Sequence, residues 1–158
     1  MNRLLLSLAL VSLVAALTGC PPPPNFLDGS IKTSHDLTFD TVEMRFLTDQ
    51  TVYELTYYKN LDEAGTDRDE ILEIAFTQAP EGVVVDTPID LTRAEANTAV
   101  ERTTAANDPF PTDRESATFT FFVAPVVGET VSGEFAVTFA NGRTLNGAYE
   151  TELGEVSF

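Results

Sequence analysis

The chain has 158 residues and carries 25 acidic against 9 basic side chains, a formal net charge of −16 at pH 7. A surface this acidic repels nucleic acid and anionic lipid headgroups, so neither is an expected partner. With no Trp, one His and one Cys, the chain offers few residues for thiol, zinc or imidazole chemistry, and we expect no catalytic, cofactor-binding or metal site.

Residues 1–19 have the successive regions of a secretory signal peptide, a basic start followed by an apolar run. Arg3 and the terminal amine give a basic start, and an apolar run from Leu4 to Leu17 follows. As a helix, these fourteen residues would extend about 21 Å, less than the roughly 30 Å hydrocarbon core of a bilayer. Pro21–Pro24 would end such a helix because proline lacks the N–H group. The sequence therefore predicts a cleaved signal peptide rather than a transmembrane helix.

The only cysteine of the chain follows this segment directly, in Leu17-Thr18-Gly19-Cys20. One cysteine in an exported protein has no partner for an intramolecular disulfide. The four residues resemble the lipobox of bacterial lipoproteins, in which the chain is cut before the cysteine and the thiol is lipidated. The resemblance implies cleavage between Gly19 and Cys20, and a diacylglyceryl thioether with an N-acyl chain such as palmitate on Cys20. The alternative is ordinary signal cleavage, which would leave Cys20 as a free thiol.

The same resemblance implies a location in the cell envelope. One acyl chain anchors marginally and two or three hold firmly, because each buried methylene contributes about 0.8 kcal/mol. In Gram-negative lipoproteins, an Asp directly after the cysteine favours retention in the inner membrane. Pro21 occupies that position here. We therefore expect a protein held by its lipid in the outer membrane, on the periplasmic or the surface face.

A proline run separates the anchor from the remainder of the chain. Pro21–Pro24 are expected to form a stiff polyproline II spacer, and we assign residues 20–30 to the anchored cysteine and linker. From 31 to 158, period-two alternation and turn residues between the runs predict β-strands almost throughout. We predict one all-β domain, an antiparallel β-sandwich of seven to nine short strands; a closed β-barrel is the alternative.

The predicted strands follow in chain order. The turn at 48–50 joins the first two strands in a hairpin, and the segment 92–104 fits either a helix or a strand, of which we favour a strand near 98–103. One or two short strands are expected around Pro88. The residues that define the strands by alternation are Val42, Met44 and Phe46; Tyr53, Leu55 and Tyr57; Leu72, Ile74 and Phe76; Val83–Val85, Ile89 and Leu91; and Phe119, Phe121 and Val123.

The C-terminal hairpin turns at Asn141-Gly142. A two-residue turn would place polar residues opposite apolar ones. A type I turn with Gly142 left-handed in a bulge keeps the apolar residues on one face, and we choose this register. The register pairs Val137 with Leu145, Phe135 with Gly147, and Gly133 with Tyr149. The pattern Gly-x-Phe-x-x-x-Phe from Gly133, followed by Leu145-Asn146-Gly147, also resembles hairpins of small bacterial surface lipoproteins; this resemblance supports the fold and implies no activity.

An acidic segment at 62–70 is the first candidate for chemistry. Its five carboxylates belong to Asp62, Glu63, Asp67, Asp69 and Glu70. A flexible loop of this kind could offer oxygens to calcium, but the spacing differs from an EF-hand and Arg68 lies within the cluster. We interpret it as a solvated loop and keep calcium as the alternative.

His35 and three tyrosines are the other candidates. Neighbouring side chains alternate in a strand, so Ser34 and His35 are not expected to face each other, and we expect His35 at the surface. Tyr53 and Tyr57 share a face with Leu55 and are expected in the core. Tyr58 falls on the opposite face, where it could contact a sugar or a peptide.

These features predict a non-enzymatic lipoprotein, a monomer whose domain binds a partner or has a structural role in the envelope. The membrane lipid reached through acylated Cys20 is one expected partner, and an unidentified protein or glycan is another. The alternative function is an envelope hydrolase that cleaves a glycan through paired carboxylates, since acidic residues occur throughout the chain.

Replacing Cys20 tests the anchor. Without the thiol there is no acceptor for the lipid, so we expect Cys20→Ala to accumulate as an unprocessed precursor and to disappear from the membrane fraction. Cell fractionation followed by immunoblotting measures both effects. A membrane pool of unchanged size would contradict the predicted anchor.

Overall fold

The computed structural model describes residues 25–92, 98–102 and 109–157. Gly19, Cys20, the proline run and part of the segment 92–104 lie outside these residues. Within them the chain is all-β, as predicted, with nine strands and two short 3₁₀-helices. These elements are β1 (Phe26–Asp28), η1 (Ser30–Thr33), β2 (Thr41–Leu47), β3 (Val52–Asn60), β4 (Arg68–Thr77), η2 (Pro80–Gly82), β5 (Ile89–Asp90), β6 (Ala99–Glu101), β7 (Arg114–Phe121), β8 (Thr130–Phe139) and β9 (Thr144–Val156).

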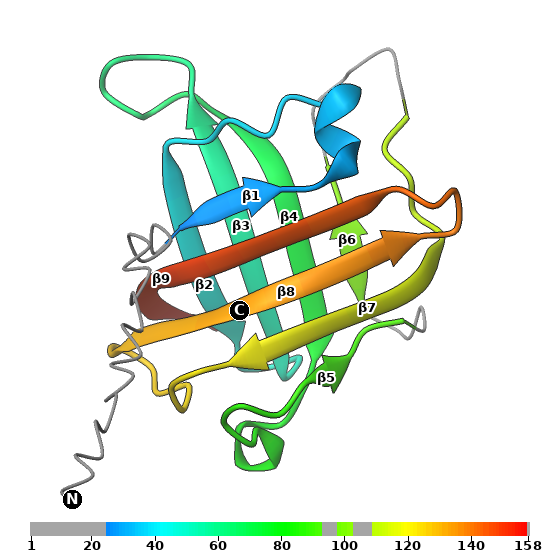
Figure 1. Cartoon of the computed structure of the whole chain (residues 1–158). Coiled ribbons are helices and arrows are strands. Elements are labelled where there is room, and N and C mark those ends of the chain that lie inside the picture. Colours follow the sequence, from blue (N-terminus) through cyan, green and yellow to red (C-terminus); the bar gives the residue numbers. More distant parts are fainter. Residues whose placement is uncertain (1–24, 93–97, 103–108, 158) are drawn as a thin grey trace, which may run out of the picture.

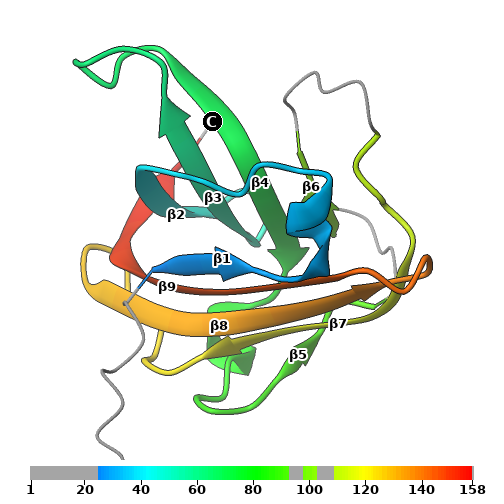
Figure 2. The same ribbon diagram turned by 45° about the horizontal axis from the view of Figure 1, so that its top comes forward.

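The strands form one sheet that curls into two facing layers. Their order is β5-β7-β8-β9-β2-β3-β4-β6, and β1 pairs with β9 beside this path. Figure 1 shows β7, β8 and β9 crossing in front of β2, β3 and β4, and Figure 2 shows the two layers meeting where β9 reaches β2. Among the described residues, the end strands β5 and β6 do not pair with each other. The predicted all-β fold is confirmed. The curled sheet forms a half-barrel, consistent with the predicted sandwich, and the described strands do not close it into a barrel.

The strand β9 joins the two layers. Its first nine residues pair antiparallel with β8, ending with Glu152 opposite Thr130. From Leu153, opposite Met44, it pairs in parallel with β2. The sheet is therefore mixed, whereas the sequence predicted only antiparallel pairs. The reason is that β9 continues beyond its pairing with β8. Its last residues then pair with β2, which lies more than a hundred positions earlier in the chain.

The core lies between the layers and is largely aromatic. Tyr53 of one layer contacts Phe121 of the other at a ring-centroid distance of 5.3 Å, and Phe76 lies 4.7 Å from Phe119. Phe119 in turn stacks on Tyr149 at 5.2 Å. Aromatic pairs at these distances add to the burial of their large apolar surfaces. The predicted core residues Tyr53, Leu55 and Tyr57 are all buried, as are the predicted Leu72, Ile74 and Phe76.

The predicted first hairpin and the predicted register of the last hairpin are both confirmed. Phe46 lies opposite Tyr53 and Met44 opposite Leu55 in the β2–β3 pair. In the β8–β9 pair, Val137 faces Leu145, Phe135 faces Gly147, and Gly133 faces Tyr149. Gly142 has a φ of 77°, its N–H donates to Phe139 O at 2.8 Å, and Phe139 N–H donates to Arg143 O at 2.8 Å. This is the bulged turn that keeps the apolar residues on one face.

Three of the predicted segments form less strand than expected. β7 stops at Phe121, so Val123 is exposed instead of continuing the buried face. Val83–Val85 form no strand, and only Ile89–Asp90 pair with β7. In the ambiguous segment the favoured strand is present as β6, which pairs with β4. The Val83–Val85 run fits a strand by propensity, but Val83 N–H donates to Pro80 O and Thr87 N–H to Val84 O, so the segment forms local turns instead.

The N-terminal part of the sheet begins before residue 31. Residues 26–28, within the range assigned to the linker, form β1 and pair with residues 146–148 of β9. The helix η1 follows and buries Ile31 completely. The acidic segment is also shorter than predicted, because Arg68–Glu70 belong to β4 and pair with the end of β3.

Gly133 is required by close packing. A Cβ atom at this position would lie 2.0 Å from Thr120 O and 2.5 Å from the Tyr149 hydroxyl oxygen. We expect Gly133→Ala to lower the free energy of unfolding by about 1–3 kcal/mol, the usual cost of overpacking a core. Gly154→Ala is the matched control, since its nearest neighbour, Met44 O, is at an ordinary 3.6 Å. Urea unfolding of both variants measures the difference, and equal midpoints would contradict the prediction.

Candidate functional site

The predicted lipidation and cleavage residues, Cys20 and Gly19, precede the described part of the chain. The first described residue, Asn25, is tied closely to the sheet. Its side-chain oxygen accepts from Glu150 N–H at 2.6 Å, and its side-chain nitrogen donates to Glu150 O at 3.4 Å. The amide thereby covers the edge of β9 just beyond β1, so the chain joins the domain at a defined position. No helix among the described residues is long and apolar enough to cross a membrane.

His35 was predicted at the surface, and this prediction is wrong: the side chain is 3% exposed. The residue does not lie in a strand but follows η1, where Ser34 has φ −125° and ψ −18°. This turn directs Ser34 Oγ toward His35 Nδ1, 2.8 Å away, although the sequence indicated that they would not face each other. The His35 ring also meets Phe110 edge-on at 5.3 Å.

The Ser34 hydroxyl does not have the surroundings of a nucleophile. Arg143, from the C-terminal hairpin, donates a hydrogen bond to Ser34 Oγ. The hydroxyl also lies 3.2 Å from Ile31 O, which it can reach as a donor. A cation that donates to the oxygen lowers its electron density, the opposite of activation by a general base. Ser34 and His35 therefore connect η1 to the turn of the last hairpin.

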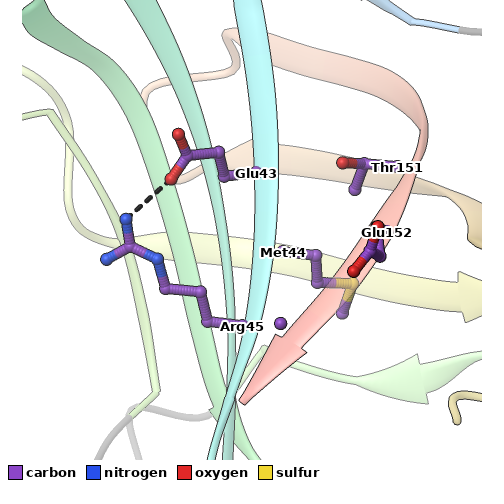
Figure 3. Close-up of a pocket in the computed structure, with 6 residues that line it drawn as sticks. Glu43, Met44, Arg45, Thr151 and Glu152 are labelled. Atoms are coloured by element: carbon purple, nitrogen blue, oxygen red, sulfur yellow. Dashed lines mark hydrogen bonds and ion pairs between the residues drawn. The ribbon is translucent and has the colours of Figure 1, made fainter. Parts of the chain in front are cut away.

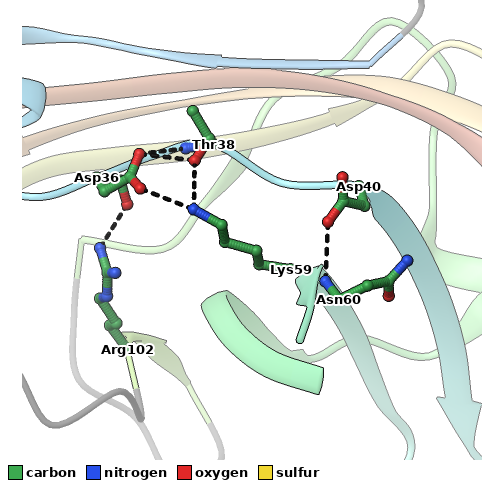
Figure 4. Close-up of polar contacts among 6 residues, drawn as sticks. All are labelled: Asp36, Thr38, Asp40, Lys59, Asn60 and Arg102. Carbon is green, nitrogen blue, oxygen red and sulfur yellow. Dashed lines mark hydrogen bonds and ion pairs between the residues drawn. The ribbon is translucent and has the colours of Figure 1, made fainter. Parts of the chain in front are cut away.

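Polar contacts beside His35 join residues 36–40 to β3 and to Arg102, directly after β6 (Figure 4). Asp36 accepts from Thr38 N–H at 3.0 Å, from Thr38 Oγ1 at 2.8 Å and from Lys59 Nζ at 3.0 Å. These hydrogen bonds, from Thr38 first and then Lys59, hold the pKa of Asp36 well below its ordinary value. Arg102 donates to Asp36 O, and Asn60 N–H donates to Asp40 at 2.8 Å. A shallow hollow of about 320 Å³ adjoins this cluster, lined by Leu27, Asp28, Lys32, His35, Asp36, Leu37 and Thr38.

The acidic loop between β3 and β4 is organised by one of its own carboxylates. Asp62 accepts from Thr66 N–H at 2.8 Å and Asp67 N–H at 3.2 Å, and the Thr66 hydroxyl donates to it as well. These bonds, the Thr66 hydroxyl first, lower the pKa of Asp62. Among the described residues there is no group of three or more His, Cys, Asp or Glu side chains that could hold a metal ion. The loop is thus built by internal hydrogen bonds rather than by converging carboxylates.

The outer face of β2, β3, β4 and β6 carries charged side chains in two neighbouring rows. The strand register places Glu43, Thr56, Glu73 and Glu101 side by side in one row. The next row begins with Arg45 and Glu54. Arg45 donates to Glu43 at 2.6 Å and lies 3.8 Å from Glu54. Thr56 is 2% exposed beneath these long side chains.

Tyr58, the predicted surface aromatic, belongs to the same face. The Arg68 guanidinium lies over its ring, 4.1 Å from the centroid, and also binds Glu43. The phenol ring is half-buried, so one ring face that could stack on a sugar is already covered by Arg68. Burial alone would raise the pKa of Glu43, but hydrogen bonds and charge from Arg68 and Arg45 lower it.

Glu73 differs from Glu43 because its neighbours are carboxylates. Burial, and then repulsion from Glu54, Glu70 and Glu101, raises its pKa to about 7. The cations Arg45 and Arg68 both bind Glu43 of β2 instead. A carboxyl group with a pKa near 7 can donate or accept a proton at neutral pH, which is the property of a general acid. Sequence reasoning did not single out Glu73, since only the strand register brings Glu101 beside it.

A second hollow, of about 270 Å³, lies where β9 leaves β8 and approaches β2 (Figure 3). Its lining includes Glu43, Arg45, Thr151 and Glu152. Thr151 Oγ1 donates to Val42 O at 3.1 Å, which bridges the two strands before their ladder begins. The hollow is open and polar and follows from the divergence of two strands rather than from a cluster of converging reactive groups.

The remaining unusual surface consists of apolar loop residues that the sequence reasoning did not single out. Val84 and Val85 in one loop, and four residues between 122 and 127 in another, are exposed. The available signal was an uncharged run that continues past the strand from Phe121 to Val127. The alternation predicts a strand through Val123, and this period carries no information about the residues beyond the strand end.

No known protein family, characterised protein or solved structure matches this chain. Its distinguishing surfaces are the charged outer face around Glu73, the Ser34–His35 cluster, and the apolar loops. The His35 cluster is engaged in internal contacts, which leaves the other two surfaces as the candidates for function.

The raised pKa of Glu73 predicts a pH dependence of stability. The folded state holds this proton up to a pH of about 7, whereas an unfolded glutamic acid loses it near 4.5, so folding binds a proton in between. The contribution of Glu73 to stability is therefore present below about pH 4.5 and is lost as the pH rises through 7. We expect Glu73→Gln to stabilise the protein at pH 8 by on the order of 1–3 kcal/mol and to have little effect at pH 4.

Chemical denaturation at both pH values measures this effect. Glu134→Gln is the control, because it removes the same charge from an exposed position on β8. An equal gain in both variants at pH 8 would trace the effect to net charge and contradict the specific role of Glu73.

Proposed function

We propose that this protein is an exported lipoprotein of the cell envelope, held by acyl chains on Cys20, whose β-domain is a non-enzymatic binding or structural module. The sequence Leu17-Thr18-Gly19-Cys20 after an apolar leader carries the proposal. With Pro21 after the cysteine, the outer membrane is the proposed location, on its periplasmic or surface face.

The way the domain begins supports this proposal. Asn25, five positions after Cys20, is hydrogen-bonded to β9, and β1, which follows it, pairs with the same strand. A lipid on Cys20 would therefore tether a rigid domain through a very short connection. A domain held in this way samples a narrow zone next to the membrane, which suits a module that meets other envelope components there.

The mass of the N-terminal peptide tests the anchor. Lys32 is the first basic residue after Cys20, so trypsin releases residues 20–32 from the processed chain. We expect this peptide, isolated from membranes of a Gram-negative host that expresses the full chain, to begin at Cys20 and to carry a diacylglyceryl group and a further acyl chain. The Cys20→Ser variant is the control and should yield no acylated peptide. An unmodified thiol at Cys20 would overturn the proposal.

A second function, glycan hydrolysis, is favoured by one observation. Glu73 has a pKa raised to about 7 and lies beside Glu54 and Glu101, whereas a glycosidase pairs a protonated carboxyl group with an ionised one. Against it, these residues lie on the outer face of a sheet, and the two hollows described above are lined by other residues.

Envelope glycan incubated with the purified protein separates the two functions. A binding module should release no fragments, and Glu73→Gln should leave retention of the protein on the glycan, or on a partner captured from envelope extracts, unchanged. Release of fragments by the natural chain that is lost in Glu73→Gln would establish the hydrolase instead.

A further inference from the structure

Six large apolar side chains are exposed at one end of the domain, and we call them the apolar tip. They come from two loops and are Val84, Val85, Phe122, Val123, Val126 and Val127. Val84 is 61% exposed and Val126 54%. Single exposed apolar residues are normal on a protein surface, but a contiguous group marks a place where the surface meets something apolar.

The two loops are held next to each other by the sheet. Asp86 N–H donates to Phe121 O at 2.8 Å, so the loop with Val84 and Val85 lies against the end of β7. The other loop begins at this same strand end. Its residues 122–127 read Phe-Val-Ala-Pro-Val-Val, without a charged or polar side chain. The charged residues nearest to the tip in the sequence are Asp86 and Glu129.

The tip lies on the same side of the domain as the point where the chain joins the sheet. Asn25 binds the backbone of Glu150, Glu150 lies opposite Ser132, and Ser132 O accepts from Phe122 N–H at 2.8 Å. These contacts form one row across the sheet. At about 4.8 Å per strand, the row places Phe122 within roughly 15 Å of Asn25. Figure 1 shows the β7–β8 loop and the start of β1 on the same, left side of the domain.

The length of chain before Asn25 limits what can cover the tip. Five residue steps separate Cys20 from Asn25, and an extended chain spans at most about 3.6 Å per residue, or roughly 18 Å in total. A lipid on Cys20 therefore keeps Asn25, and with it the tip, within reach of the bilayer surface. A second copy of the chain or a protein partner would have to compete with this membrane for the same side of the domain.

We propose that the apolar tip inserts into the interfacial layer of the bilayer that holds the anchor; this proposal rests on the lipid anchor of the proposed function. The acyl chains and the tip together give two contacts, which fix the orientation of the domain as well as its distance from the membrane. The matching lipid is a zwitterionic phospholipid, because a chain of net charge −16 is repelled by anionic headgroups. Figures 1 and 2 show the acidic β3–β4 loop at the upper left of the domain, with the start of β1 between it and the β7–β8 loop.

Tryptophan reporters test the insertion, because the natural chain has no Trp. Val126→Trp places the probe in the tip, and Leu61→Trp places it in the β3–β4 loop at a side chain that is also 54% exposed. Each full chain is expressed, purified from membranes and reconstituted into phosphatidylcholine vesicles with brominated acyl chains. We expect the emission of Val126→Trp to move to shorter wavelength and to be quenched by the bromine atoms, and that of Leu61→Trp to remain as in buffer.

The outcomes separate this proposal from the proposed function. Acylated Cys20 with equal quenching of both probes, or of neither, overturns the insertion and leaves the anchor standing. An unmodified Cys20 overturns the anchor. In that case, quenching of Val126→Trp on added vesicles would still support insertion of the tip, and no quenching would overturn the insertion. A concentration-dependent shift of Val126→Trp without quenching would show a second copy covering the tip and would also overturn insertion. Matching urea midpoints of both variants and the natural chain verify that the probes leave the fold intact.

Discussion

The continuity of β9 holds this fold together. Up to Glu152 the strand belongs to the layer of β7 and β8, and from Leu153 it belongs to the layer of β2, β3 and β4. Because one strand supplies both ladders, the layers cannot separate without breaking it, and their inner faces enclose a single aromatic core. Tyr149 lies just before the crossing and stacks against Phe119, while Leu153 lies just after it and is also buried.

The same strand positions the first described residues, from Asn25 to the end of β1. Its free edge is covered in turn by β1, by the Asn25 amide, by β2 through the Thr151 hydroxyl, and finally by the β2 ladder. An uncovered edge is a template for unwanted strand pairing, so this coverage protects the domain as well as locating it. In the proposed arrangement, the short tether and the apolar tip act on one side of the domain. The charged outer face of β2, β3, β4 and β6 stays in solvent, where its carboxylates keep the domain soluble.

Charge and apolar surface are thus divided between different parts of the molecule. The outer face sets carboxylates beside one another along the strand register, and the proximity of Glu54, Glu70 and Glu101 together with burial raises the pKa of Glu73. The loops at the end of β7 instead carry uncharged residues from Phe122 to Val127. A domain this acidic gains little from electrostatic attachment to a membrane, so acyl chains and apolar side chains are the attachments that suit it.

What the sequence determined by itself was local. Period-two alternation identified the main strands and the core residues Tyr53, Leu55 and Tyr57, and the Asn141-Gly142 turn determined the register of the last hairpin, because a slip of one residue would expose its apolar face. The lipobox-like segment around Cys20 is equally local and remains a prediction from sequence. Contacts between distant residues were decided only by the tertiary structure: the parallel pairing of Met44 with Leu153, the position of Glu101 beside Glu73, and the burial of His35 against Phe110. Each of these depends on where separate strands end and meet in space, and alternation within one strand carries no information about its distant neighbours.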